Sequence, residues 1–309
     1  MSEEIQVPGV SAPPGFRSGF AALVGRANVG KSTMLNRLVG VKVAIVSPVP
    51  QTTRNRILGV ANVPGRGQVA YLDSPGLHRP QHHLGERLNE TARQVAGEAD
   101  VLVFIFDASL GFGPGDEHVR GELERDRRDR PVILVPNKID QMNKGKLLPL
   151  IEQATRDWGY VDVVPVSALS GDNVARLCEV VLSRLPEGPP LFPLDYVTDQ
   201  GDRRMIAEIV REKLLARLRQ EVPHSVAVVL DRLEPRPGGL LHVDASILVE
   251  RPTQKAIVIG KGGSMLKEVG TEARKELETR LGTRVYLKLW VKVRENWRDR
   301  DPILHELGL

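Results

Sequence analysis

Short apolar runs alternate with helical patterns over the first part of the chain, from Phe20 to about Leu185. These runs lack the strict in-and-out alternation of half-exposed strands, which indicates strands that are covered on both faces. They are FAALV (20–24), VAYLD (69–73), VLVFIFD (101–107), PVILVPN (131–137) and VDVVPVS (161–167). The pattern predicts an α/β domain, a mostly parallel sheet with helices on both faces, whose chemistry lies at the carboxyl ends of the strands.

The pattern changes after a proline-rich stretch, LPEGPPLFPLDYVTDQ (185–200), which is typical of a linker or a stiff connection. The segment 252–259 begins with a proline suited to the first turn of a helix, although its Ile-Val-Ile would also suit a strand. Taken as a helix, it gives the order α-β-β-α-α-β, an α+β domain. The other expected elements are helices over 203–220 and 264–282 and strands over 224–233, 240–250 and 283–296.

The predicted organisation is therefore a loose N-terminal tail (1–16), an α/β domain (17–187), a linker (188–201) and an α+β domain (202–309). A length of 309 residues agrees with two domains. The N-terminus is acidic and rich in Pro and Gly, unlike a signal peptide, and the longest apolar runs are too short to cross a membrane. We expect a cytoplasmic protein, in which the single cysteine, Cys178, is a packed thiol.

Charge is unevenly distributed along the chain. The whole protein carries +4, but residues 251–300 hold 13 Lys/Arg against 6 Asp/Glu, a local +7. A local excess of this size suits a polyanionic partner, whereas a solvated helix face would explain it equally well.

The segment GRANVGKS (25–32) fits the phosphate-binding pattern G-x-x-x-x-G-K-[ST] between a predicted strand and a predicted helix. Its glycines let backbone N–H groups surround phosphate oxygens, and the following helix adds its dipole. Lys31 would span the β- and γ-phosphates, and Ser32 would offer a hydroxyl to Mg²⁺. We expect the nucleotide phosphates to contact Gly25, Arg26, Ala27, Asn28, Val29, Gly30, Lys31, Ser32 and Thr33.

Three further motifs follow at strand ends: DSPG (73–76), NKID (137–140) and SAL (167–169). Asp73 is expected to hold Mg²⁺ through water, and the Gly76 N–H to meet the γ-phosphate. The Asp140 carboxylate can accept both guanine N1–H and N2–H₂, which adenine does not offer, so the site should select GTP over ATP. The remaining expected base contacts are Asn137, Lys138 and a backbone N–H from Ser167 or Ala168. The set resembles the translation-factor-like class of small GTPases, and implies an enzyme that hydrolyses GTP to GDP and phosphate.

A threonine between the first two motifs should reach Mg²⁺ only when a γ-phosphate is present. By resemblance we choose Thr53 rather than Thr52. Leu77 stands where many GTPases carry the glutamine that orients the attacking water. In related GTPases that lack this glutamine, an asparagine at the position of Asn28 helps hold K⁺; a role in the geometry of the loop alone is the alternative. Lys31, Thr53, Gly76 and Asn28 are the residues expected to assist hydrolysis.

A second glycine-lysine loop, GKGG (260–263), lacks the spacer of a phosphate-binding loop and lies between two predicted helices. It fits the GxxG loop of a KH domain, which clamps about four nucleotides of a single strand. Lys261 would meet the sugar-phosphate backbone, and Lys267 and Arg274 would project from the next helix. The expected RNA-binding residues are Gly260, Lys261, Gly262, Gly263, Lys267 and Arg274.

This combination resembles the Era GTPases of bacteria and organelles, over residues from about 19 to 309. The segments that carry the resemblance include PQTTRNRI (50–57), SVAVVLDRL (225–233), QKAIVIGKGGSMLKEVG (254–270) and VKVRENWRDR (291–300). The resemblance implies a P-loop GTPase domain followed by a type II KH domain. It also implies a monomer that uses GTP/GDP and Mg²⁺, binds the 3′ end of 16S ribosomal RNA and assists maturation of the 30S subunit.

Val49 departs from the family pattern, in which a basic residue is expected. Two rival hypotheses remain open at this stage. One is a membrane-associated or cell-cycle signalling GTPase whose basic C-terminal domain binds protein or lipid. The other is an RNA-binding chaperone that holds GTP only as a structural ligand. Members of the family are also found at the inner membrane face, but no anchor is encoded in these residues.

Overall fold

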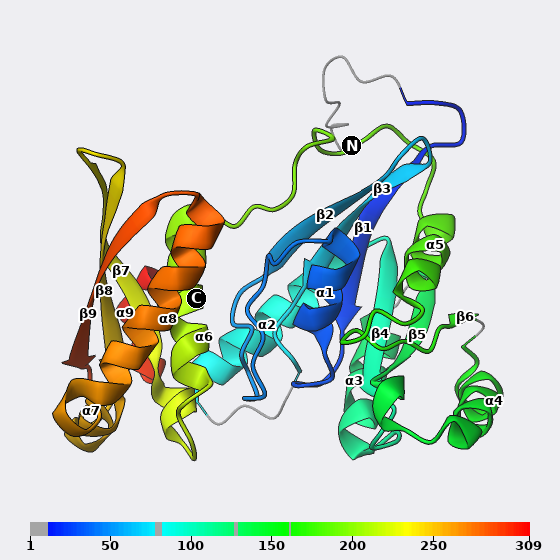
Figure 1. Ribbon diagram of the computed structural model, residues 1–309. Coiled ribbons are helices and arrows are strands. Elements are labelled where there is room, and N and C mark those ends of the chain that lie inside the picture. Colours follow the sequence, from blue (N-terminus) through cyan, green and yellow to red (C-terminus); the bar gives the residue numbers. More distant parts are fainter. Residues whose placement is uncertain (1–11, 78–81, 127–128, 161) are drawn as a thin grey trace. The chain divides into compact units, whose positions relative to one another are not determined.

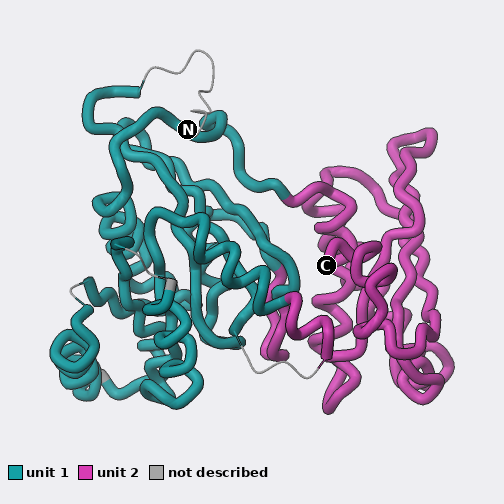
Figure 2. Tube along the Cα trace, turned by 180° about the vertical axis from the view of Figure 1, so that it is seen from behind, with its two compact units in different colours: residues 1–44, 53–79, 88–199 teal, residues 45–52, 80–87, 200–309 magenta. Residues whose placement is uncertain are grey.

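The computed structural model describes residues 12–77, 82–126, 129–160 and 162–309. The chain divides into two compact units, which Figure 2 distinguishes by colour. The first unit comprises residues 1–44, 53–79 and 88–199, and the second comprises residues 45–52, 80–87 and 200–309.

The first unit is built on a six-stranded sheet with the strand order β2-β3-β1-β4-β5-β6. Only β2 runs antiparallel, beside β3; the other neighbouring pairs are parallel. This confirms the mostly parallel sheet predicted for this half of the chain. The strands are β1 (Arg17–Val24), β2 (Ile57–Val63), β3 (Gly67–Asp73), β4 (Val101–Asp107), β5 (Val132–Asn137) and β6 (Asp162–Val163).

Helices cover both faces of this sheet (Figure 1), and alternate residues along β4 show which helices lie on which side. Val103 and Ile105 pack in one core with α1 (Lys31–Val39) and α5 (Val174–Arg184). Leu102, Phe104 and Phe106 pack on the opposite face, in a second core. The helices of that core are α2 (His83–Glu98), α3 (Pro114–Asp126) and α4 (Leu147–Trp158). A strand buried on both faces needs apolar residues throughout, which explains its unbroken run.

Two strands differ from the sequence-based prediction. β2 (Ile57–Val63), between the first two motifs, was not among the predicted strands. β6 was predicted over 161–167 but is assigned only to Asp162–Val163. Val164 and Val166 still donate backbone N–H groups to Leu134 and Pro136 of β5, at 2.9 and 2.8 Å. Pro165, between them, has no N–H, but this removes no bond to β5, because its nitrogen faces the free edge of the sheet.

The proline-rich stretch lies on the first unit instead of hanging free. Val197 O accepts a hydrogen bond from Val60 N at 2.8 Å, and Gln68 Oε1 accepts from the N–H groups of Leu191 and Phe192. The Phe192 ring packs edge-on against Phe20. The connection is therefore hydrogen-bonded to β2 and β3 at these positions.

The second unit contains a three-stranded sheet in the order β7-β8-β9, in which β7 and β8 are antiparallel and β8 and β9 are parallel. Its elements are α6 (Asp202–Leu215), β7 (Ala227–Arg236), β8 (Leu240–Val249), α7 (Pro252–Ile259), α8 (Ser264–Leu281) and β9 (Arg284–Val293). This is the predicted order, and the ambiguous segment 252–259 is a helix. Residues of α6 and α8 pack against one face of the sheet.

A short helix after β9, α9 (Asp301–Glu306), was not predicted. Trp297 precedes it, is fully buried, and donates its indole N–H to Ser225 O at 2.8 Å. Arg298 pairs with Glu250, so the end of the chain is held against β8. Among the described residues, no helix is long and apolar enough to cross a membrane.

Candidate nucleotide site and nucleic-acid interface

The loop Gly25–Ser32 joins β1 to α1, at the carboxyl edge of the sheet. Asn28 has φ 64° and Gly30 has φ 100°, both in the left-handed region. A Cβ added at Gly30 would lie 2.3 Å from Asn137 Nδ2. Glycine is therefore required there both by the backbone conformation and by the close approach of the NKID segment.

Lys31 crosses the inside of this loop. Its Nζ donates to Gly25 O at 2.9 Å and to Arg26 O at 2.8 Å, and the side chain is 6% exposed. Burial lowers the pKa of Lys31 to about 8, while the nearby Asp73 carboxylate raises it. An incoming phosphate would restore the full charge of the ammonium group, because an anion within a few ångströms favours the charged form.

Ser32, Thr53 and Asp73 converge at the start of α1. Ser32 Oγ donates to Asp73 Oδ2 at 2.6 Å and lies 2.7 Å from Thr53 Oγ1, which is 3.3 Å from the same carboxylate oxygen. Thr52 instead donates its hydroxyl to Val49 O. Of the two threonines, the structure thus brings Thr53 to the expected metal ligands.

Asp73 has a fully buried carboxylate, and its Oδ1 has no hydrogen-bond partner among the described residues. Burial raises the pKa of Asp73, against the opposing effects of Lys31 and of hydrogen bonds from Ser32 and Thr53. A buried oxygen without a partner is costly unless a ligand satisfies it. The cluster of one carboxylate and two hydroxyls has the hard oxygen donors that Mg²⁺ prefers.

The DSPG segment lies directly against the phosphate-binding loop. Ser74 Oγ donates to Leu23 O at 3.2 Å, and a Cβ added at Gly76 would lie 2.4 Å from Ala27 N. A side chain at position 76 would therefore collide with the backbone of the loop. Leu77, which follows, is buried in the apolar core between the sheet and α2 and α3.

Asn137 links the NKID segment to the rest of the site. Its Nδ2 donates to Val29 O at 2.7 Å, and its Oδ1 accepts from Ala168 N at 3.0 Å. Lys138 donates to Asp107 Oδ2 at 2.6 Å. Asp140 is exposed, with its carboxylate accessible to a base. The Ala168 N–H is directed at Asn137 in this conformation, so a guanine O6 would have to compete for it.

Three side chains make supporting contacts that have no distinctive signal in the sequence. Arg26 donates to the buried carboxylate of Asp116 at 2.7 Å, which ties the phosphate-binding loop to α3. Asn36 accepts the N–H groups of Val43 and Ala44 at 2.8 and 2.9 Å. Arg37 donates to Ala168 O at 3.1 Å. Each side chain forms hydrogen bonds with backbone atoms or with a side chain far away in sequence. A local sequence motif does not reveal such contacts.

The segment 45–52 belongs to the second unit. There, Glu212 Oε1 of α6 accepts from Val46 N at 2.9 Å, and Arg211 donates to Thr52 O. Arg211 is 2% exposed and also pairs with Glu208. The residue before Thr53 is therefore held by α6 of the second unit.

The GKGG loop connects α7 to α8, and all three of its glycines have positive φ: 75° at Gly260, 61° at Gly262 and 81° at Gly263. A Cβ added at Gly260 would lie 2.8 Å from Met265 N, whereas one at Gly262 meets nothing within 4 Å. The loop is therefore tight where it enters α8 and open at Gly262. Lys261 is exposed beside this opening.

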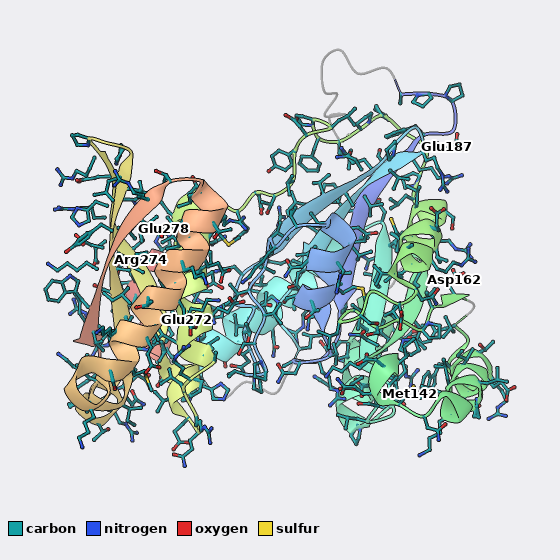
Figure 3. All side chains as sticks on the ribbon, viewed as in Figure 1. Met142, Asp162, Glu187, Glu272, Arg274 and Glu278 are labelled. Atoms are coloured by element: carbon teal, nitrogen blue, oxygen red, sulfur yellow. The ribbon has the colours of Figure 1, made fainter. Side chains whose placement is uncertain are left out.

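Charges on α8 are sorted by face. Three of its four acidic residues pair with α6 and the residues that follow it: Glu268 and Glu272 with Arg217, and Glu276 with Lys213. The fourth, Glu278, accepts from Val285 N at 3.0 Å. Lys267 and Arg274 lie two turns apart, on one exposed face. In Figure 3, Arg274 is labelled on α8 between Glu272 and Glu278. The part of α8 next to the GKGG loop therefore presents Lys267 and Arg274, while its nearest acids are paired with Arg217 and Lys213.

Comparison with known proteins agrees with this geometry. A family model described as "50S ribosome-binding GTPase" matches residues 20–138, and a KH domain model matches residues 221–298. The chain is 47% identical over 293 residues to GTPase Era of Heliobacterium modesticaldum, covering 95% of this chain and 97% of that protein.

Two solved structures are similar over nearly their whole length. One is Era in complex with MgGDPNP and nucleotides 1506–1542 of 16S ribosomal RNA. The other is a tyrosine-to-alanine variant of Aquifex aeolicus Era bound to GDP·AlF₄⁻. Each matches with a TM-score of 0.91 and 44% identity, covering 95% of this chain and 99% of the other.

Proposed function

This chain belongs to the Era family of GTPases, and we propose that it is a GTP-driven switch that binds the 3′ end of 16S ribosomal RNA and assists maturation of the 30S subunit. The observation that carries the proposal is the presence of two separate glycine-lysine loops in one chain. One joins β1 to α1 beside Asp73, and the other joins α7 to α8 below a basic helix face. A nucleotide suits the first loop, and a nucleic-acid backbone suits the second.

In the first unit, this chain's residues would hold the phosphates and orient the base. Lys31 and the N–H groups of residues 25–32 would bind the β- and γ-phosphates, while Asp140 would select guanine. Ser32, Thr53 and the buried Asp73 fit Mg²⁺, since the partnerless Asp73 Oδ1 needs a ligand. The metal would neutralise charge on the phosphates during hydrolysis. We assign Gly76 to the γ-phosphate, because only glycine fits against Ala27 there.

Hydrolysis should depend on K⁺ if Asn28 helps to hold this ion. Leu77 is apolar and buried, so it does not orient water, and Asn28 is exposed on the phosphate-binding loop. We expect faster turnover in KCl than in NaCl at the same concentration, measured by phosphate release. Asn28→Gly should abolish the difference, since glycine keeps the left-handed backbone and removes the side-chain oxygen. Equal rates in both salts for the unmodified protein would rule out K⁺ assistance.

In the second unit, the GKGG loop and the basic face of α8 would clamp single-stranded RNA. Gly260, Gly262 and Gly263 let the backbone approach the strand, and Lys261, Lys267 and Arg274 supply positive charge near it. The relative solved with 16S ribosomal RNA supports this choice of partner. The KH-type order of elements also argues against a domain that binds only protein or lipid.

RNA affinity should differ several-fold between the GTP-analogue and GDP states, roughly 1 kcal/mol or more. Arg211 donates a hydrogen bond to Thr52 O, and Thr53, the next residue, is the proposed sensor of the γ-phosphate. A movement of Thr53 would therefore be transmitted to α6. The test is titration of a 3′-terminal 16S oligonucleotide in each nucleotide state. Thr53→Ala should bind GTP yet lose the difference. If the unmodified protein binds the RNA with the same affinity in both nucleotide states, the two sites are not coupled and the protein is not a switch.

We further propose that the protein acts as a monomer in the cytoplasm. Peripheral association with the inner membrane face is a separate proposal. It would rest on the basic second unit, since 13 Lys/Arg against 6 Asp/Glu lie between residues 251 and 300.

A further inference from the structure

The sheet of the second unit has one face that the helices leave open. Along β9, Val285, Leu287, Leu289, Val291 and Val293 belong to the core with α6 and α8. The alternate residues point to the opposite face because side chains alternate along a strand. These are Arg284, Tyr286, Lys288, Trp290 and Lys292, and all five are exposed. We call them the outer row.

The outer row alternates basic and aromatic side chains without interruption. Tyr286 and Trp290 are 52% and 49% exposed, which is unusual for large aromatic rings. The Tyr286 ring meets His242 of β8 edge-on, with ring centroids 5.0 Å apart, and Lys288 Nζ lies 4.5 Å from the Trp290 ring centroid. The rings are thus supported by neighbours and remain open to a ligand.

Acidic residues on the same face lie mainly on the neighbouring strands and have partners there. Asp244 of β8 lies 3.1 Å from His242 and 3.7 Å from Arg232, while Glu234 of β7 lies 3.2 Å from Arg236. Asp231 accepts from Ser246 and lies 3.6 Å from Lys292. The row itself contains no acid, so its own charge is positive.

A row of this composition suits a single strand of nucleic acid. Bases stack on exposed rings, and cations between the rings meet the backbone phosphates. Successive outer-row side chains are about 6.6 Å apart along the strand, a spacing of the same order as that between nucleotides of an extended chain. A duplex hides its base faces, so it would leave Tyr286 and Trp290 without stacking partners.

The outer row is also reachable from the proposed RNA clamp. β8 and β9 run parallel, and α7 begins at Pro252, three residues after β8 ends at Val249. The carboxyl end of β9 therefore lies toward α7 and the GKGG loop (Figure 1). A clamp of this kind takes about four nucleotides, whereas the RNA in the similar Era complex runs from nucleotide 1506 to 1542. Most of such an RNA must lie elsewhere.

We propose that the outer row of β9 is a second RNA-binding surface, on which single-stranded nucleotides flanking the clamped segment stack against Tyr286 and Trp290. This inference rests on the proposed RNA-binding function. It adds a surface that the GxxG pattern does not contain.

The first test compares two oligoribonucleotides of the same 16S 3′ sequence, one of five nucleotides and one of fifteen. The full-length protein should bind the longer one more tightly, and Trp290→Ala should weaken the longer one at least about fivefold, the low end for one lost base stack. The shorter one should bind unchanged. Trp290→Phe should restore most of the affinity, and Leu148→Ala, at an exposed apolar residue of the first unit, is the control. An unchanged affinity of Trp290→Ala for the longer RNA would overturn the proposal.

The second test uses the fluorescence of Trp290. Trp297 is fully buried and Trp158 is half-buried against Phe112, so acrylamide should quench mainly Trp290. The fifteen-nucleotide RNA should protect it from acrylamide, and the five-nucleotide RNA should not. Protection by vesicles of anionic phospholipid, without protection by RNA, would assign the row to membranes instead. If neither RNA binds the protein at all, the proposed function fails first, and this outcome is distinct from loss of the length effect alone.

Discussion

Replacing Asp140 with asparagine should lower GTP affinity by at least about tenfold. The carboxylate is expected to accept both guanine N1–H and N2–H₂, and hydrogen bonds to a charged group contribute about 1.5–3 kcal/mol. The asparagine amide would supply one acceptor and a donor that faces the N–H groups of guanine. Because Asp140 is exposed, the substitution should leave the fold intact. The measurement is a titration with a fluorescent guanine nucleotide.

Two controls make this result specific. The same variant should gain affinity for a xanthine nucleotide, whose O2 can accept from the asparagine amide. Lys31→Ala should abolish binding of both nucleotides, because Lys31 would hold phosphate and not base. GTP binding by Asp140→Asn that equals that of the unmodified protein would sink the guanine assignment.

Replacing Gly262 with aspartate should abolish RNA binding while GTP hydrolysis by the first unit continues. Gly262 has φ 61° and an added Cβ meets nothing within 4 Å, so the protein should tolerate the side chain at a modest backbone cost. An RNA backbone must approach this position closely, where the carboxylate adds repulsion to the steric block. High salt screens only the repulsion, so it should not restore binding.

Gly262→Asn is the matched control for the charge. It has nearly the same size and accepts a left-handed backbone, so any affinity that it keeps over Gly262→Asp measures repulsion alone. The readout is an electrophoretic shift with a 3′-terminal 16S oligonucleotide, alongside phosphate release from GTP. If Gly262→Asp binds the RNA as tightly as the unmodified protein does, the KH-type clamp is refuted.

Strand ends were the most predictable part of the nucleotide site. Each motif follows an apolar run, and parallel strands bring their carboxyl ends to one edge, so Ser32, Asp73 and Asn137 could be expected to lie near each other. The contacts of Asn36 and Arg37 could not be predicted, because these side chains bind backbone atoms in distant loops. The direction of the Ala168 N–H is likewise set by Asn137, a tertiary contact.

In the second unit, the alternation of apolar and polar residues predicted the strands, but the sequence did not show where the basic surface lies. Alternation over 283–296 predicts β9, but it does not say which neighbours cover each face. The local +7 also predicts a basic surface without locating it. Its location depends on Lys213 and Arg217, which pair with three of the four acids of α8, whereas Lys267 and Arg274 are exposed. The helix α9 was not predicted, because six residues are too few to show a helical periodicity.

We propose above all that this GTPase binds the 3′ end of 16S ribosomal RNA through the GKGG loop of its second unit. The most direct measurement is ultraviolet crosslinking of the protein to RNA in living cells, followed by sequencing of the attached fragments. The unmodified protein should carry fragments concentrated at the 3′ end of 16S ribosomal RNA, and Gly262→Asp should lose them. Fragments spread evenly over cellular RNA, or an unchanged pattern in Gly262→Asp, would contradict the account.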